Sequence, residues 1–240
     1  MKKTKTYESI ELSSSQEDYI KEIFHLAERG EPVTTLALAQ KIGVKAASVT
    51  EMVKKLTKLG LVQRKPYYEI SLTETGIRIA MEILRHHRLL ETFLVEKLGY
   101  QWDEVHGEAE RLEHVISEQF EQAIAKLLNH PLRDPHGDPI PSQELVMPFE
   151  EQEQELVTLD KGEKAEVKRI IAQDPQSLRF FNTLGLLPGT MVEVLEVSAE
   201  EITLQIWGKA PHQASIPLFI GKKIKVIPRQ LPHRECSKEL

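Results

Sequence analysis

Imidazole and carboxylate side chains concentrate between residues 86 and 115, and their spacing suits metal binding. An expected helix over residues 103–128 places several of them on a single face, within an arc of about 100°: His106, Glu110, Glu113 and His114. Imidazole nitrogen and carboxylate oxygen suit Mn²⁺ and Fe²⁺, whereas thiolates would favour zinc, copper or iron–sulfur chemistry. The pattern predicts a metal site, although each residue taken singly is also typical of an exposed helix face.

The preceding expected helix, residues 73–98, repeats this arrangement. His87 and Glu91 are four residues apart and therefore lie one turn apart on the same face. Apolar residues form an adjoining stripe, which in the second helix comprises Val105, Ala109, Leu112, Ile116 and Phe120. Both ligand faces are thus expected to border a hydrophobic core.

The composition of the 240-residue chain is that of a globular protein, with 40% hydrophobic and 28% charged residues. No stretch approaches the roughly 20 apolar residues of a membrane helix, and no apolar segment of a secretory signal follows the basic N-terminus. We therefore expect a cytoplasmic protein with no membrane partner. The single cysteine, Cys236, cannot form an internal disulfide and is expected to be a solvated tail thiol.

Charge is distributed unevenly along the chain. Residues 1–80 carry 13 Lys and Arg against 10 Asp and Glu, a balance of +3, while the remainder has a balance of −9. An excess of positive charge in the N-terminal region of an otherwise acidic chain is compatible with an N-terminal domain that binds a polyanion.

The front of the chain has the pattern of a winged helix-turn-helix. Helices are expected over residues 14–29, 35–42 and 45–60, followed by two β-prone runs in residues 61–72 that fit a hairpin, or wing. Such a fold places its second helix in the major groove of DNA and uses basic flanks for phosphate contacts. The expected DNA-binding residues are Lys45, Ala47, Ser48, Thr50, Glu51, Lys54, Lys55, Arg64 and Lys65. Protein-binding domains also use this geometry, so the pattern alone leaves that alternative open.

The remainder of the chain divides at turn-rich segments. A connector follows residue 128, where Asp134 and His136 are expected to be turn residues, and an acidic tether follows it. Short β runs then predict a small barrel. The expected fold class is mainly α with a small β part. The expected domains are the winged helix-turn-helix DNA-binding domain (1–75), the helical dimerisation and metal-binding domain (76–143), an acidic linker (144–162), the small barrel (163–228) and a tail (229–240).

The order of these segments resembles the diphtheria toxin repressor family of metal-dependent transcription repressors. The resemblance rests on the winged helix followed by LRHHRLLETFL, VHGEAERLEHVISE and PHGDPIP, and it covers nearly the whole chain. It implies a homodimer that binds a palindromic operator in double-stranded DNA, and a C-terminal domain that is SH3-like and FeoA-like.

The resemblance also implies which residues hold metal. His87, Glu91 and His106 match the ancillary site, to which Asp174 could add a ligand. The primary site is matched by Asp18, Glu110, Glu113 and His114. From the residues alone, Asp18 has the alternative of a carboxylate that stabilises the start of a helix. Lys21 stands where some short manganese regulators have a second N-terminal carboxylate.

Carboxylates at positions 18 and 110 are similar to the manganese branch of the family, whereas the iron branch has Met and Cys there. The resemblance implies a repressor of metal-uptake genes that responds to Mn²⁺, or alternatively to Fe²⁺; Zn²⁺, Co²⁺ or Cd²⁺ could bind in vitro. No enzymatic activity or small-molecule substrate is expected. The rivals are a carboxylate-bridged metalloenzyme and a winged helix that senses an organic ligand. The metalloenzyme would need a Glu-x-x-His pair from each of two helices, but the sequence offers only Glu22 with His25, on the wrong helix, and HExxH is absent.

Overall fold

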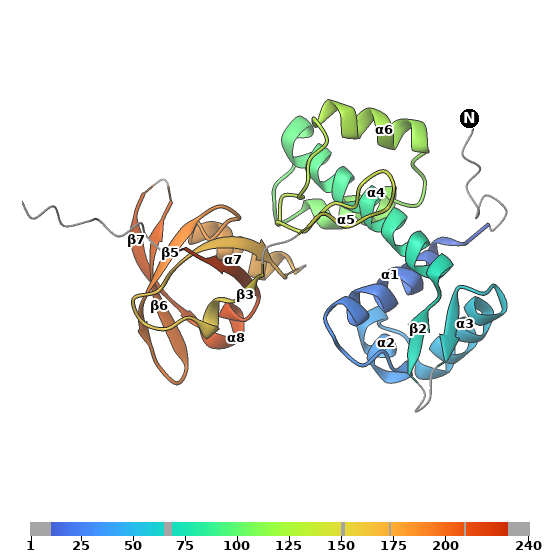
Figure 1. The fold of residues 1–240 in the computed structure, drawn as a ribbon, viewed down its shortest axis with the longest axis horizontal. Helices are drawn as coiled ribbons and strands as arrows, with labels where there is room; N and C mark the ends of the chain where they lie inside the picture. The colour runs from blue at the N-terminus through green and yellow to red at the C-terminus, as the bar shows by residue number, and fades with distance from the viewer. Residues whose placement is uncertain (1–10, 65–68, 150–151, 173, 209, 230–240) are drawn as a thin grey trace, which may run out of the picture. The chain divides into compact units, whose positions relative to one another are not determined.

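The computed structural model describes residues 11–64, 69–149, 152–172, 174–208 and 210–229 (Figure 1). These residues form two compact units. The first contains the described parts of 1–90, 109–130 and 140–147, and the second those of 91–108, 131–139 and 148–240. The division falls within one long helix, so each unit is assembled from segments that are distant in sequence.

The first unit begins with the expected helix-turn-helix. Helix α1 (Ser14–Glu28) starts after Ser13, whose backbone N–H donates to Gln16 Oε1 at 2.9 Å. Helix α2 (Thr35–Ile42) is capped by the hydroxyl of Thr34, and α3 (Ala46–Lys58) follows a turn at Gly43. The φ of Gly43 is 76°, a value that a residue with a Cβ rarely adopts, so glycine makes this tight turn possible.

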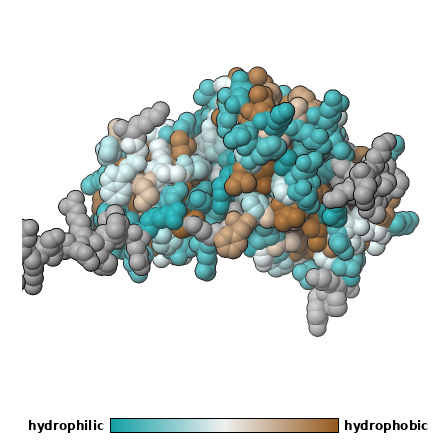
Figure 2. Space-filling model, turned by 45° about the horizontal axis from the view of Figure 1, so that its top comes forward, coloured by the Kyte–Doolittle hydropathy of each residue, from teal (hydrophilic) through white to brown (hydrophobic). Residues whose placement is uncertain are grey.

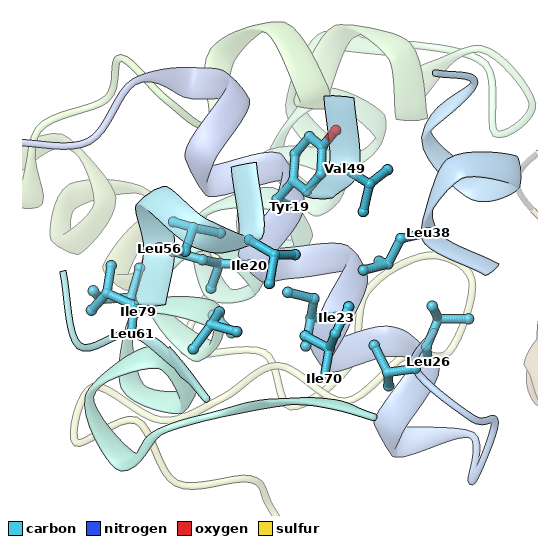
Figure 3. Close-up of a cluster of buried hydrophobic side chains, with 14 of the residues drawn as sticks. Tyr19, Ile20, Ile23, Leu26, Leu38, Val49, Leu56, Leu61, Ile70 and Ile79 are labelled. Carbon is cyan, nitrogen blue, oxygen red and sulfur yellow. The ribbon is translucent and has the colours of Figure 1, made fainter. Parts of the chain in front are cut away.

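A continuous hydrophobic core holds these helices together (Figure 3). Its labelled side chains converge from α1, α2, α3, the wing and the following helix. Ile20, Ile23, Leu38, Val49 and Leu56 are completely buried. Burial of each such side chain contributes about 1.5–3 kcal/mol, and it fixes the side of α3 that remains exposed.

The wing is a two-stranded antiparallel sheet of β1 (Val62–Arg64) and β2 (Ile70–Leu72), in which Val62 pairs with Leu72. Helix α4 (Glu74–Leu98) follows directly. A Cβ at Gly76 would lie 2.1 Å from the carbonyl oxygen of Leu61, so only glycine permits this close approach. The expected wing is therefore confirmed; Lys65, which was predicted to contact DNA, lies outside the described residues.

The prediction of a single helix over residues 103–128 is wrong. The chain forms two helices, α5 (Val105–Leu112) and α6 (Glu118–Leu127). The hydroxyl of Ser117 accepts a hydrogen bond from the Phe120 backbone N–H at 3.2 Å, which starts a new helix. Glu113 and His114 consequently lie at and beyond the end of α5 and do not continue the helix face of His106.

The C-terminal part of the second unit is a six-stranded antiparallel sheet in the order β3-β8-β4-β5-β6-β7. Its strands are β3 (Gln154–Glu155), β4 (Lys164–Ile170), β5 (Met191–Val197), β6 (Glu201–Trp207), β7 (His212–Pro217) and β8 (Ile224–Pro228). The helical elements are the 3-10 helix Leu156–Thr158, α7 (Pro175–Thr183) and α8 (Leu218–Gly221). Strand β3 precedes the expected start at residue 163, and β7 was not expected because its polar sequence, HQASIP, lacks a β pattern.

Apolar residues from these strands and from α7 form the core of the sheet domain, which includes Val167, Phe181, Val194, Leu204 and Val226. All five are completely buried. Among the described residues, no helix has the length and apolar character needed to cross a membrane.

Candidate metal centres and DNA-binding surface

Three side chains of the first unit form the first candidate metal centre: Asp18, Glu113 and His114. Their ligand atoms all lie within 4.8 Å of one another. His114 Nε2 is 3.1 Å from Asp18 Oδ1 and 3.5 Å from Glu113 Oε1. Atoms bound to one small divalent ion at about 2.1 Å lie about 3 Å apart, so this donor set fits such an ion. The centre joins α1 to the segment that follows α5.

Lys21 lies at the same centre. Its Nζ is 2.5 Å from Glu113 Oε1 and 3.1 Å from Glu110 Oε1, and the residue is only 4% exposed. Glu110 is therefore beside the centre but is bound to an ammonium group, and it is outside the three-residue group. The sequence drew attention to Lys21 as a substitution, but this burial and pairing could not be predicted from it.

His87 bonds to the first centre as well, because its Nδ1 is 2.5 Å from Glu113 Oε2. Both oxygens of Glu113 are thus occupied, and its side chain has no exposed area. Burial opposes the charged form, yet the hydrogen bonds from His87 and Lys21 hold the pKa of Glu113 below its usual value. Glu113 is therefore an ionised, fixed carboxylate.

A second ionic network fixes the turn that carries these ligands. His86 Nδ1 lies 3.2 Å from the Glu113 backbone oxygen, and Arg85 Nε is 2.6 Å from Glu121 Oε1 on α6. Arg85 also donates to the carbonyl oxygen of Pro141 at 2.6 Å. The start of α6 and the strap of residues 140–147 are thereby tied to α4.

The second candidate centre lies in the second unit and comprises Glu91, Asp134 and His136, all buried. His136 Nδ1 is 3.5 Å from Glu91 Oε2, and His106 Nδ1 is 3.0 Å from Glu91 Oε1. The Nε2 of His136 lies 3.0 Å from the Trp102 carbonyl oxygen, so Nε2–H donates there and Nδ1 faces the carboxylate. Imidazole and carboxylate donors again suit a divalent ion.

The connector after residue 128 forms the turn expected from its sequence and also contacts the sheet domain. Asp134 Oδ1 accepts hydrogen bonds from the backbone N–H groups of His136 and Asp138, which makes the predicted turn. His136 also accepts at its carbonyl oxygen from Ile170 N–H of β4, at 2.9 Å. A Cβ at Gly137 would lie 2.1 Å from the Lys168 carbonyl oxygen. The connector is thus fastened to the sheet domain.

His87 and Asp174 are the remaining predicted ligands of the ancillary site, and that role stays a prediction for both. His87 belongs to the first unit, whereas Glu91 and His106 belong to the second, so the predicted set draws on both units. Asp174 caps α7 by accepting from Ser177 N–H at 2.8 Å, and its other oxygen is 3.2 Å from Lys223 Nζ. No metal-type group found among the described residues includes Asp174, and its service as a ligand stays a prediction.

The candidate DNA-binding surface is the outer face of α3 and the adjoining strand β1. The side chains of Lys45, Ala47, Ser48, Glu51, Lys54, Lys55 and Arg64 are exposed, and Thr50 is partly exposed. Lys54 Nζ is 2.8 Å from Glu51 Oε1, and the Thr50 hydroxyl donates to the Ala46 carbonyl oxygen at 3.0 Å. The surface therefore combines exposed basic side chains with small polar groups, as DNA contacts require.

The fold and the two centres define a class: a winged helix-turn-helix protein whose DNA-binding domain is linked to metal-type ligand clusters. Family comparisons give the same class along the chain. Residues 11–70 match "Iron dependent repressor, N-terminal DNA binding domain", 73–142 match "Iron dependent repressor, metal binding and dimerisation domain", and 154–228 match "FeoA domain".

Comparisons with individual proteins and solved structures support the same class. The chain is 37% identical to the iron-dependent repressor IdeR of Mycobacterium tuberculosis over 131 residues, which cover 55% of this chain and 57% of that protein. A structure described as "Manganese-dependent transcriptional repressor complex with manganese" has a TM-score of 0.83 and 37% identity, covering 89% of this chain and 100% of the other. ScaR with bound Cd²⁺ has a TM-score of 0.76 and 28% identity, covering 88% and 98%.

The protein belongs to the iron-dependent repressor family, the family of the diphtheria toxin repressor. Its members are metal-dependent DNA-binding transcriptional repressors and are not enzymes. The expected fold class of three domains is confirmed. The segment aligned with IdeR spans little more than half of that relative's length.

Proposed function

We propose that this protein is a manganese-activated repressor that binds a palindromic operator as a homodimer in the cytoplasm and controls metal-uptake genes. The observation that carries the proposal is the first centre, in which Asp18 of the DNA-binding domain meets Glu113 and His114 of the metal-binding segment. A divalent ion there would supply positive charge shared by ligands from both segments. Atomic absorption of the purified protein, loaded with Mn²⁺ and desalted, tests whether the chain holds the metal.

The coupling follows from how these residues are held. Glu113 and His114 are fixed through the turn that His86, Arg85 and Glu121 anchor to α4. Asp18, in contrast, is carried by α1, whose side chains form the core beneath α3. Ligands on both sides of one ion therefore restrict the position of the DNA-binding helix. Only about 1–3 kcal/mol of coupling is needed, which is typical of allosteric pairs.

The second centre supports a second metal position. Glu91, Asp134 and His136 would be its ligands, with His106 beside Glu91. His87 and Asp174 are retained as proposed additional ligands. Because the His136 loop is bonded to β4, an ion here would stabilise the contact between that loop and the sheet domain.

Exposed apolar side chains support self-association. Val115, Phe120 and Leu127 of the α5–α6 segment are 74%, 46% and 58% exposed. On the face drawn in Figure 2, apolar side chains form patches among hydrophilic ones. Such patches commonly mark protein interfaces, and the matching domain profile is that of a dimerisation domain. Two copies would present two α3 helices, as a palindrome requires.

Metal choice is a consequence of the donor atoms. Asp18 and Glu110 offer hard oxygen where soft sulfur would favour other ions. We expect Glu110→Cys combined with Asp18→Met to shift activation from Mn²⁺ toward Fe²⁺ or Co²⁺, measured as DNA binding in anaerobic titrations with each metal. If the wild type responds equally to all three ions and the double variant behaves the same, these residues do not select the metal.

The second centre should bind metal in competition with a proton. Although burial opposes protonation, the hydrogen bond to Glu91 raises the pKa of His136 to about 9. The protonated imidazole must lose its proton to bind metal, so affinity at this centre should rise by up to about tenfold per pH unit from neutrality until about pH 9, and then level off. Competition titrations with a chelator at several pH values measure this slope. A His136→Gln variant should lose it, and a flat wild-type profile would refute the prediction.

The same raised pKa makes a stability contribution with a defined sign. The protonated His136 stabilises the folded protein, and this contribution is fully present below the ordinary histidine pKa of about 6.5. The contribution is lost as the pH rises through about 9, the pKa of His136 in the folded protein. Metal-free protein should therefore lose stability over this interval, where metal binding at the second centre is strengthened.

Lys54→Ala and Arg64→Ala should each weaken binding to all duplexes alike, because both side chains are exposed cations on the candidate surface. Each lost phosphate contact should flatten the dependence of log K on log salt by about one unit. Ser48→Ala should instead change the preferred sequence. Fluorescence anisotropy on specific and random duplexes at several salt concentrations separates the two effects; identical behaviour of all variants would mean that α3 is not the recognition helix.

A further inference from the structure

Glu17 lies behind the imidazole ring of His114, on the side opposite the first centre. Its Oε2 is 2.5 Å from His114 Nδ1, while the other ring nitrogen, Nε2, lies 3.1 Å from Asp18 Oδ1. The contact joins residues 97 positions apart in the chain. The Glu17 side chain is 24% exposed and that of His114 is 11% exposed, so water competes little for this bond.

The chemistry of the two groups fixes the direction of this hydrogen bond. An ionised carboxylate can only accept, so Nδ1 of His114 carries the proton and donates it to Glu17. A neutral ring protonated at Nδ1 keeps its lone pair at Nε2, the atom that faces Asp18 and Glu113. Glu17 therefore selects the tautomer in which the correct nitrogen is free for metal.

His114 needs such an orienting partner because of its place in the fold. It lies beyond the last residue of α5, in the turn before α6, so its own backbone is not part of a helix. Consecutive residues of α1 contact opposite nitrogens of the ring, Glu17 at Nδ1 and Asp18 at Nε2. Two consecutive residues near the start of α1 thus determine both the tautomer and the rotation of the imidazole.

From this geometry we infer that Glu17 is a positioning residue of the first centre: it orients His114 for a divalent ion without binding the ion itself. The inference rests on the proposed function of that centre. Glu17 is not among the residues whose ligand atoms cluster there, which are Asp18, Glu113 and His114. Carboxylates that hold a metal-binding histidine in this way typically affect metal affinity by about 10–100-fold.

The test compares three variants of the full-length protein: Glu17→Ala, Glu17→Gln and Glu113→Gln. Mn²⁺ affinity is measured by competition with a fluorescent chelator, and thermal unfolding is measured on the metal-free proteins. The ¹⁵N NMR shifts of the His114 ring report its tautomer. Glu31→Ala serves as the matched control, because it removes an exposed carboxylate just beyond the other end of α1.

Glu17→Ala should lower Mn²⁺ affinity by about 10–100-fold and change the ring ¹⁵N shifts, with the midpoint of metal-free unfolding close to that of the control. Glu17→Gln should recover most of the affinity, because its amide oxygen still accepts from Nδ1–H. An Ala variant with wild-type affinity, or a Gln variant as weak as Glu113→Gln, would overturn the inference, the latter by making Glu17 a direct ligand. If Glu113→Gln itself binds Mn²⁺ normally, the proposed centre fails instead.

Discussion

The double variant Glu113→Gln with His114→Ala should lose metal-dependent DNA binding. Both residues contribute ligand atoms to the first centre, and Glu113 is its most buried member. Removing a carboxylate charge and an imidazole nitrogen leaves Asp18 as the one remaining member of that group. Operator affinity with Mn²⁺ should then fall to the metal-free level, a loss of about 5–150-fold for a coupling of 1–3 kcal/mol.

This loss must be separated from unfolding. Glu113 is bonded to Lys21 and His87, so the variant will lose some stability, but the hydrophobic core of the first unit includes neither substituted residue. Far-UV circular dichroism should therefore remain that of the wild type. A matched control, Glu200→Gln with His212→Ala, changes the same residue types at exposed positions of the sheet domain. If the first-centre variant keeps metal-stimulated DNA binding, the assignment of this centre is wrong.

Lys21→Met should destabilise the metal-free protein by about 3 kcal/mol, the low end of the range for breaking a buried ion pair. Burial opposes charge on Lys21, but Glu113 and Glu110 raise its pKa, so the group is a fixed cation. Its replacement removes the ammonium group from the buried Glu113, which keeps its hydrogen bond with His87, while Glu110 is about half exposed and is hydrated more easily. This difference accounts for the modest expected value.

Metal should reverse this effect, because a divalent ion at Asp18, Glu113 and His114 replaces the missing positive charge. Thermal unfolding of wild type and Lys21→Met, with chelator and with Mn²⁺, measures the difference. Lys58→Met, at an exposed position of α3, should show little change under either condition. Equal destabilisation with and without Mn²⁺ would mean that Lys21 does not neutralise the metal ligands.

Local sequence signals explain most of the fold. Ser, Thr and Gly at helix ends and apolar residues at helical spacing were sufficient for α1 to α4 and the wing, because these features act within a few residues. The break at Ser117 was missed, since the apolar spacing of Ile116 and Phe120 continues across it and only the serine signals a new helix. Strand β7 was missed because its alternation is weak and its pairing with β6 decides its conformation.

The sites could be predicted only in part, because their contacts are distant in sequence. Glu110, Glu113 and His114 were suggested by local spacing, but no periodicity shows that Lys21 pairs with residues 89 and 92 positions away. Glu17 is next to Asp18, and its contact with His114, 97 positions away, likewise could not be predicted from local spacing. His136 had a turn signal alone, and its approach to Glu91 depends on how the connector folds against β4.

The most direct test of metal-dependent repression is DNA binding by the wild-type protein with and without metal. Duplexes selected from a random pool in the presence of Mn²⁺ provide a probe, and binding is followed by anisotropy in chelator, in Mn²⁺ and in Mg²⁺ as a control for simple charge screening. We expect tight, sequence-selective binding in Mn²⁺ that is lost in chelator and is not restored by Mg²⁺. Equal sequence-selective affinity in chelator and in Mn²⁺ would contradict it.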